Sequence, residues 1–351
     1  MAVKDFFSRN AGIIGAVAAV GLAAGGVAAG VAADRYVRRR RTAADDPHAQ
    51  EPFGALQSDE QYGVTTSDGV DLYVEVIDGP GPTLLFVHGF CLDMGTFHFQ
   101  RRAFEGVYRE VLYDQPGHGR SGRLPKGEYT LDALGAGLRA VLDKAAPSGK
   151  VVLVGHSMGG MTIMALAEQS PELFEDRVAG VVLISSSAGR INEVTFGLPA
   201  VFSRFSKPLL PVVRSAGRLT TSMADAARRA SSDLAWLLTR RYGFGTEKPS
   251  PAVVSYVEKM NSTTSTEVIA RYVHTLYTHS RVPALAALRS VPVLVVCGDT
   301  DLLLPLAYSE EIVRELPDAE LVVVEGGGHV ALLEHPAAVN DAMKAFLERI
   351  T

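Results

Sequence analysis

The sequence predicts an α/β protein whose core is a mostly parallel, doubly wound sheet. Short runs of Val, Leu and Ile without polar alternation recur along the chain, which is typical of strands covered on both faces. Segments with apolar residues at helical spacing separate several of these runs, so neighbouring strands are expected to be parallel. Residues that could take part in catalysis follow several strands. They are expected at the edge where such sheets bind ligands.

The expected elements follow one another in a clear order. A hairpin opens the folded part at residues 63–77, with its turn at Ser67-Asp68-Gly69. Two helices are predicted at 131–146 and 160–171. Buried strands are predicted within residues 83–89, 110–116, 150–157, 180–186, 291–299 and 319–327.

One stretch interrupts the alternation of strand and helix. Residues 188–286 contain helical-looking pieces and no convincing buried strand, so we expect a helical cap that separates two parts of the core, 61–187 and 287–351. A cap over the catalytic edge excludes water and shapes a pocket. Its large apolar side chains would line that pocket or form the cap's own small core: Phe196, Phe202, Phe205, Trp236, Phe244 and Tyr272.

Composition excludes several classes of protein. With 351 residues, 47% of them hydrophobic, the chain can bury a large core and is not disordered. A net charge of −5 gives no electrostatic reason to expect a nucleic-acid partner. The two cysteines, Cys91 and Cys297, lie far apart and predict no disulfide framework. No metal-binding constellation stands out, so neither a metal nor another cofactor is expected.

The N-terminal part predicts a membrane anchor. After a flank at residues 1–10, residues 11–33 form an uncharged Ala- and Gly-rich run of 23 residues, long enough as a helix to cross a ~30 Å hydrocarbon core. An arginine cluster at 35–41 follows, within a basic segment and linker at 34–60. Such a cluster binds anionic headgroups and resists translocation, which predicts a single-pass protein of the cell membrane with its catalytic domain in the cytoplasm.

Three alternatives for this segment remain open. Lys4 and Arg9 could form the basic region of a signal peptide cleaved after Val31-Ala32-Ala33, which would export the protein. A soluble Ala-rich helix and a disordered tail are the other two. The arginine cluster argues against all three.

The strongest local signal is Gly155-His156-Ser157-Met158-Gly159, between a predicted strand and a predicted helix. A serine on a sharp strand-to-helix turn needs neighbours without side-chain bulk, which the two glycines supply. The hydroxyl of Ser157 would then project from the top of the sheet. A serine hydroxyl is a poor nucleophile at neutral pH, so a base must accept its proton.

Candidate partners of Ser157 follow two later strands. Asp299 ends the strand at 291–299 and Asp301 lies just beyond it, and His329 follows the next strand after three glycines. The chain order Ser, Asp, His brings these side chains together above such a sheet. We expect His329 to be the base and Asp301 to orient it, with Asp299 as the second candidate for the acid.

These motifs resemble the α/β-hydrolase superfamily over nearly the whole span 62–351. They are HGF at 88–90, DQPGHGRS at 114–121, GHSMGG at 155–160, GDTD at 298–301 and GGGHVALLEHP at 326–336. The resemblance implies Ser157 as nucleophile, Asp301 as acid and His329 as base. It also implies an oxyanion hole formed by the backbone N–H groups of Phe90 and Met158.

Other polar residues near these motifs are expected to be structural. In this family a histidine at the position of His88 usually supports the oxyanion loop, which is the loop that carries Phe90. His118 lies in a tight turn, and His156 occupies the variable position of the Gly-x-Ser-x-Gly motif at 155–159. Cys91 is expected to be an inert thiol beside the loop. Asp114 and Ser121 are expected to anchor a turn.

The predicted reaction is ester hydrolysis through an acyl-enzyme on Ser157. The resemblance extends to esterases, monoacylglycerol-lipase-like enzymes and non-haem haloperoxidases, and a serine nucleophile disfavours dehalogenases and epoxide hydrolases. A membrane helix and an aromatic cap favour apolar or lipid-like acyl esters as substrates. The alternatives are a carbon–carbon bond or other small-molecule hydrolase and a membrane-tethered ligand-binding protein with little turnover. Nothing in the sequence indicates the oligomeric state.

Overall fold

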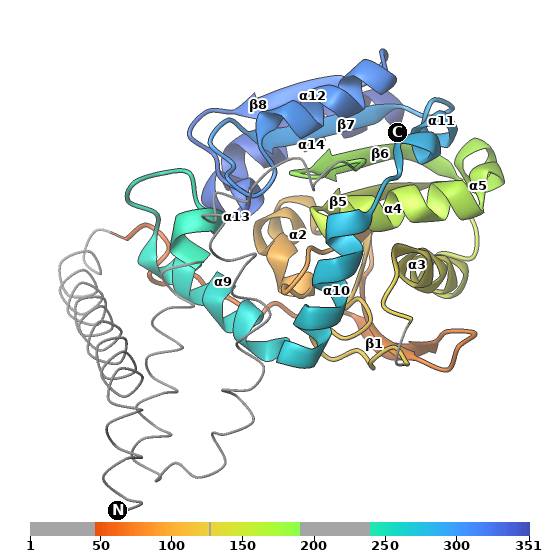
Figure 1. The fold of residues 1–351 in the computed structure, drawn as a ribbon, viewed down its shortest axis with the longest axis horizontal. Helices are drawn as coiled ribbons and strands as arrows, with labels where there is room; N and C mark the ends of the chain where they lie inside the picture. Colours follow the sequence, from red (N-terminus) through yellow and green to blue (C-terminus); the bar gives the residue numbers. More distant parts are fainter. Residues whose placement is uncertain (1–45, 126–127, 190–238) are drawn as a thin grey trace, which may run out of the picture.

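The protein is built around one eight-stranded sheet with the strand order β1-β2-β4-β3-β5-β6-β7-β8 (Figure 1). The structure is a computed structural model that describes residues 46–125, 128–189 and 239–351. The strands are β1 Glu60–Thr65, β2 Asp71–Ile77, β3 Thr83–Val87, β4 Arg109–Tyr113, β5 Val151–His156, β6 Val178–Ile184, β7 Val293–Gly298 and β8 Glu320–Val324.

The predicted sheet is confirmed in its main features. β1 and β2 form the predicted antiparallel hairpin, β2 also pairs antiparallel with β4, and the remaining neighbours are parallel. The residues of β3, β5 and β7 are buried throughout, because helices cover both faces of these apolar runs. The carboxyl ends of the parallel strands therefore meet at one edge of the sheet.

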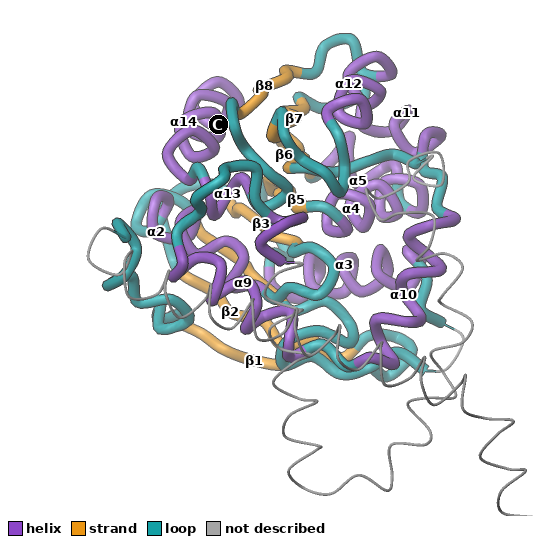
Figure 2. The backbone as a smooth tube through the Cα atoms, turned by 60° about the vertical axis from the view of Figure 1, so that its left-hand side comes forward, coloured by secondary structure: helices purple, strands orange, loops and turns teal. Residues whose placement is uncertain are grey.

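Helices form a layer on each face of the sheet (Figure 2). α3 (Leu131–Ala145) turns an apolar face to the sheet, and the side chain of Thr130 caps its first turn. It shares its layer with α4 (Met158–Gln169), α5 (Pro171–Asp176), α11 (Leu285–Leu288) and α12 (Leu306–Glu315). The other layer contains η1 (Met94–Phe97), α2 (His98–Phe104), α13 (Ala331–Glu334) and α14 (Pro336–Ile350).

Residues 239–286, the longer described part of the predicted cap, contain helices and none of the strands of the sheet. α9 (Pro251–Thr263) and α10 (Thr266–Thr278) begin at Ser250 and Ser265, whose side chains accept hydrogen bonds from backbone N–H groups of the first turns. Buried residues of α9 belong to one core layer and those of α10 to the other, so the pair spans both layers. Figure 1 shows the two helices meeting in a V.

Two of the aromatic residues predicted for the cap, Phe244 and Tyr272, are buried. Phe196, Phe202, Phe205 and Trp236 lie outside the described residues. A bridge between Gly189 and Ser280 joins the two ends of the insertion at its base. The limits 188–286 stay a prediction.

The segment just before β1 packs on α9 and, through Glu51, contacts His98 of α2 at 2.7 Å. The carboxylate of Asp46 accepts hydrogen bonds from the Ala252 N–H (3.0 Å) and the Ser250 hydroxyl (2.7 Å) at the start of α9. The ring of Phe53 stacks on Tyr256 of α9, with centroids 4.4 Å apart. The predicted membrane helix at 11–33 lies outside the described residues, and among the residues that are described no helix is long and apolar enough to span a bilayer.

Glu110, on β4, carries a carboxyl group that is buried in the core, and among the described residues neither of its oxygens has a hydrogen-bond partner. Burial raises its pKa to about 8, so the folded protein holds a proton that the unfolded chain releases near pH 4.5. The contribution of Glu110 to stability should therefore fall as pH rises from about 4.5 to 8, because at this group the unfolded state binds fewer protons than the folded state in that range.

We predict that Glu110→Gln, which cannot ionise, is more stable than wild type at pH 8 by on the order of a few kcal/mol. The difference should shrink towards pH 5, where the wild-type carboxyl is increasingly protonated in both states. Urea unfolding at several pH values measures it. A difference that does not change between pH 5 and 8 would contradict this explanation.

Candidate active site

Ser157 occupies a strained turn between β5 and α4. Its backbone has φ 53° and ψ −117°, a left-handed φ that costs a residue with a Cβ about 1–3 kcal/mol. The helix begins so close to the sheet that a Cβ on Gly159 would lie 1.9 Å from the Val87 carbonyl oxygen. A Cβ on Gly155 would lie 2.6 Å from the backbone nitrogen of Gly160. Glycine at these positions is what allows the turn that the sequence predicted.

The structure brings the three predicted side chains together. His329 Nε2 lies 2.9 Å from Ser157 Oγ, and His329 Nδ1 lies 2.8 Å from Asp301 Oδ2. Since a carboxylate only accepts, Nδ1 carries the proton and Nε2 is free to accept the serine proton. All three residues are buried, with exposed fractions of 8%, 3% and 8% for Ser157, Asp301 and His329. The arrangement can make the hydroxyl nucleophilic.

Of the two acid candidates, only Asp301 contacts the histidine. Its second oxygen, Oδ1, accepts the N–H groups of Leu303 (2.8 Å) and Leu304 (2.9 Å), which fixes the carboxylate in place. Asp299 is exposed and accepts a hydrogen bond from the Gly326 N–H at 2.8 Å. Asp299 therefore stabilises the loop before His329.

The loop that carries His329 is held from two sides. His156 Nε2 lies 2.9 Å from the His329 carbonyl oxygen and donates to it, which ties the loop to the end of β5. The Glu334 carboxylate accepts the Gly328 N–H at 2.9 Å and also the N–H groups of Gly245 and Thr246 from the cap segment. Sequence reasoning missed Glu334, because its cap partners lie almost ninety residues away in the chain.

The two predicted oxyanion donors are backbone N–H groups beside Ser157. Met158 is the first residue of α4, where helix N–H groups have no partner within the helix. Within the described chain, neither this amide nor that of Phe90 donates a hydrogen bond. The Gly89 carbonyl accepts from His88 Nδ1 (2.8 Å). Because C=O and N–H of a trans peptide point in opposite directions, this bond also fixes the direction of the Phe90 N–H.

Three buried histidines around the oxyanion loop are kept neutral. Burial lowers the pKa of His118 to about 4 and that of His156 to about 3, and it lowers the pKa of His88 well below its usual value. Burial also raises the pKa of the Cys91 thiol to about 12, so this cysteine is protonated at neutral pH. These groups are hydrogen-bonding and packing residues, as the sequence predicted.

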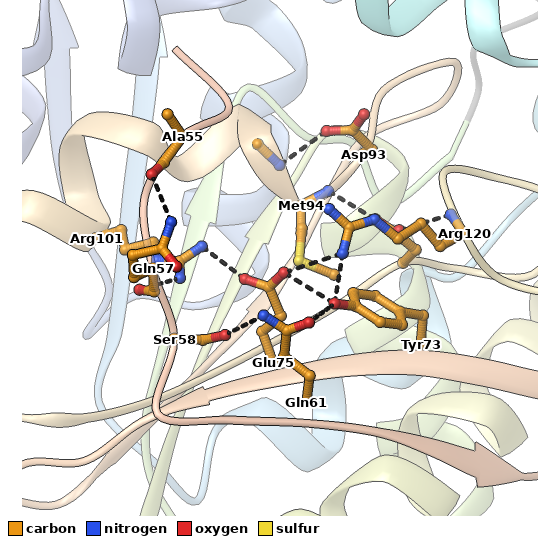
Figure 3. A network of polar contacts seen from close by, with 12 residues as sticks. Ala55, Gln57, Ser58, Gln61, Tyr73, Glu75, Asp93, Met94, Arg101 and Arg120 are labelled. Atoms are coloured by element: carbon orange, nitrogen blue, oxygen red, sulfur yellow. Dashed lines mark hydrogen bonds and ion pairs between the residues drawn. The ribbon is translucent and has the colours of Figure 1, made fainter. Parts of the chain in front are cut away.

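A polar network surrounds Glu75 and includes Asp93 and Met94, which follow Phe90 in the chain by a few residues (Figure 3). Glu75 is buried between Arg101, at 2.8 Å, and Arg120, at 3.4 Å. Asp114 accepts the N–H groups of Met94 (2.9 Å) and Arg120 (2.8 Å), and burial with the nearby Asp93 raises the pKa of Asp114 to about 7. A cavity of about 210 Å³ lies here, between α2, α9 and the segment before β1.

None of the three residues of the Ser157 site lines that cavity, and the network's charges largely compensate one another. In the parts of the chain that the structure describes, no three His, Cys, Asp or Glu side chains are grouped as a metal site would require.

The family model for the α/β hydrolase fold matches residues 82–336. This chain belongs to the α/β-hydrolase family. The α/β hydrolase is 27% identical over 268 residues to 3-oxoadipate enol-lactonase 2 of Acinetobacter baylyi, covering 76% of this chain and 89% of that protein.

Solved structures agree with this assignment. A thermophilic esterase from Thermogutta terrifontis superposes with a TM-score of 0.61 at 26% identity, over 83% of this α/β hydrolase and 99% of the esterase. A bromoperoxidase from Bacillus anthracis superposes with a TM-score of 0.66 at 19% identity, over 82% and 100% of the two chains, and shows the shared fold.

The two acid candidates can be separated by matched substitutions in this α/β hydrolase. Asp301→Asn removes the carboxylate that fixes the His329 tautomer, so hydrolysis of an activated ester should fall about 10⁴-fold in kcat. Asp299→Asn should retain activity within about threefold, since that side chain is hydrogen-bonded to the loop at Gly326 and does not contact His329. Steady-state kinetics on the two purified variants measures the difference. Equal losses, or a larger loss in the Asp299 variant, would contradict the arrangement described above.

Proposed function

We propose that this α/β hydrolase cleaves carboxylic esters through an acyl-enzyme on Ser157. The observation that carries the proposal is the continuous hydrogen-bonded chain Ser157–His329–Asp301, buried at the carboxyl edge of the sheet. In the first step Ser157 Oγ attacks the ester carbonyl while His329 Nε2 accepts the hydroxyl proton. His329 then gives this proton to the leaving alcohol, and the serine ester remains.

Water completes the cycle by the same route. His329 takes a proton from water as it attacks the serine ester, and returns the proton to Ser157 Oγ as the acid leaves. In both steps the carbonyl oxygen becomes negative. The N–H groups of Phe90 and Met158, which have no partner within the described residues, would donate hydrogen bonds to that oxygen. Each such donor typically contributes 10²–10³-fold to kcat.

The relatives support an ester as the bond that is cleaved. The 27% identical relative is named an enol-lactonase, and a lactone is a cyclic ester. A solved neighbour of 26% identity is an esterase. Against a carbon–carbon bond hydrolase stands the sequence Phe90-Cys91-Leu92-Asp93 after the His-Gly pair, where such enzymes usually carry further glycines.

The nucleophile can be tested by covalent labelling. A fluorophosphonate probe should label the full-length wild-type protein, and Ser157→Ala should abolish both labelling and ester hydrolysis, because Ser157 is the hydroxyl that His329 activates in the described structure. Circular dichroism confirms that the variant is folded. Folded wild-type protein that resists the probe and turns over no ester would favour the alternative, a ligand-binding protein without useful catalysis.

We further propose that the enzyme is tethered to the cell membrane, with its catalytic domain in the cytoplasm, and acts on apolar or lipid-like acyl esters. The tether is supported by the uncharged run at 11–33 and the arginine cluster after it. The substrate class is supported by the apolar ring of Phe90, which is only partly buried at the oxyanion loop, and by the aromatic side chains predicted for the cap.

Fractionation combined with a chain-length series tests the tether and the substrate class together. When the full-length chain is expressed in a bacterium, esterase activity should sediment with membranes after a high-salt wash. With p-nitrophenyl esters, kcat/KM should rise by tenfold or more from acetate to octanoate. Activity on acetate alone would contradict the substrate class. A soluble exported chain lacking about the first 33 residues would contradict the tether and support the cleaved signal peptide.

A further inference from the structure

The oxyanion loop contains a tight turn with a strained residue in it. The Leu92 N–H donates to the Gly89 carbonyl at 3.3 Å, which closes a four-residue turn. Cys91, its third residue, has φ 59°, whereas Phe90 before it is not among the residues with positive φ. This is the pattern of a type II turn, which normally needs Gly or Asn at the third position. Cys91 adopts this backbone only if something nearby stabilises it.

His118 provides that stabilisation. The Cys91 N–H donates to His118 Nε2 at 3.1 Å, and His118 Nδ1 lies 3.1 Å from the Pro116 carbonyl oxygen. Since the carbonyl can only accept, Nδ1 carries the proton and Nε2 is the acceptor in the neutral ring. Burial lowers the pKa of His118 to about 4, so the acceptor is present throughout the neutral range.

The His118 ring is held in this orientation by its neighbours. Tyr272 of α10 donates its hydroxyl to the same Pro116 carbonyl at 3.0 Å, and its ring lies 5.5 Å from the His118 ring. Phe90 contacts the other rings edge-on, 6.0 Å from His118. The imidazole therefore has little freedom to turn its Nε2 away from Cys91.

The turn matters because it holds the peptide that carries the Phe90 N–H. The oxygen of that peptide is the Gly89 carbonyl, which accepts from His88 and from Leu92. The hydrogen bond from the Leu92 N–H to the Gly89 carbonyl closes the turn in its type II form. If the peptide between Phe90 and Cys91 rotates to relieve Cys91, this second bond and the orientation of Phe90 change together.

We propose that His118 is a positioning residue for ester hydrolysis, which holds Cys91 in its strained conformation and so keeps the Phe90 N–H directed at the carbonyl oxygen of the bound ester. The inference rests on the proposed function. It assigns a role to a residue that touches neither the substrate nor the reacting atoms. His88 holds the Gly89 carbonyl independently, so loss of His118 should weaken catalysis without abolishing it.

A double-mutant cycle between positions 91 and 118 tests the proposal on full-length protein. His118→Phe keeps an aromatic ring and removes the acceptor, and the Pro116 carbonyl still receives the Tyr272 hydroxyl. We expect kcat on an activated ester to fall on the order of 10–100-fold, less than for loss of a whole oxyanion donor, with KM changed less than about threefold.

The same substitution should have a much smaller effect in a Cys91→Gly background. Glycine adopts a positive φ without strain, so the turn no longer needs the imidazole. We expect less than about a threefold fall in kcat from Cys91→Gly to the double variant. A residue that merely packs would lower thermal stability equally in both backgrounds and would show no such dependence on residue 91.

Three results would overturn the proposal. Wild-type kcat in folded His118→Phe, or equal falls in both backgrounds, would remove the positioning role and leave the proposed function intact. Absence of any turnover by the wild-type chain would overturn both. If His118→Phe does not fold, as judged by circular dichroism, His118→Ala takes its place in the cycle with the same expected dependence on residue 91.

Discussion

The site depends on how closely α4 approaches the sheet at the end of β5. Ser157 is turned outward by a left-handed backbone, and that turn exists only because the glycines around it leave room for direct contact between backbones. β5 lies between β3 and β6 in the sheet. The loop after β3 therefore reaches Ser157 from one side, and the loops after β7 and β8 reach it from the other.

Of the three side chains, His329 comes from the strand farthest from Ser157, because β8 lies three strands from β5 in the sheet. The glycine-rich loop after β8 passes directly over the end of β7, where a Cβ on Gly298 would lie 2.0 Å from the Gly327 carbonyl oxygen. Hydrogen bonds from Glu334 and His156 then fix the loop at each side of His329. Backbone packing thus sets the positions of Ser157, His329 and Asp301, and the side-chain hydrogen bonds of Glu334 and His156 fix the loop that carries His329.

Much of the fold and of the candidate site was predictable from local pattern. Continuous apolar runs predicted the buried strands, and the motif order predicted that Ser157, Asp301 and His329 would meet. α2, α12 and α14 were not predicted. The order of β4 and β3 in the sheet could not be predicted either, because the sequence of a strand does not indicate which distant strand it pairs with.

Contacts between distant segments explain the remaining gaps. Glu334 bonds to the cap segment, and Cys91 bonds to His118. In each case the partners are far apart in the sequence, and no sequence motif links them. The backbone strain at Cys91 could not be predicted for the same reason, since a cysteine in the sequence does not indicate a positive φ. The anchoring of α9 by Asp46 could not be inferred, because the segment around Asp46 reads as a polar linker.

The most direct test of the central claim is to observe the acyl-enzyme. The full-length protein is mixed with a p-nitrophenyl ester, quenched within milliseconds, digested and analysed by mass spectrometry. The account predicts a mass increase equal to the acyl group on the peptide that contains Ser157, formed together with a burst of p-nitrophenol. An acyl group on a different residue, or release of p-nitrophenol by wild-type protein and by Ser157→Ala at equal rates, would contradict it.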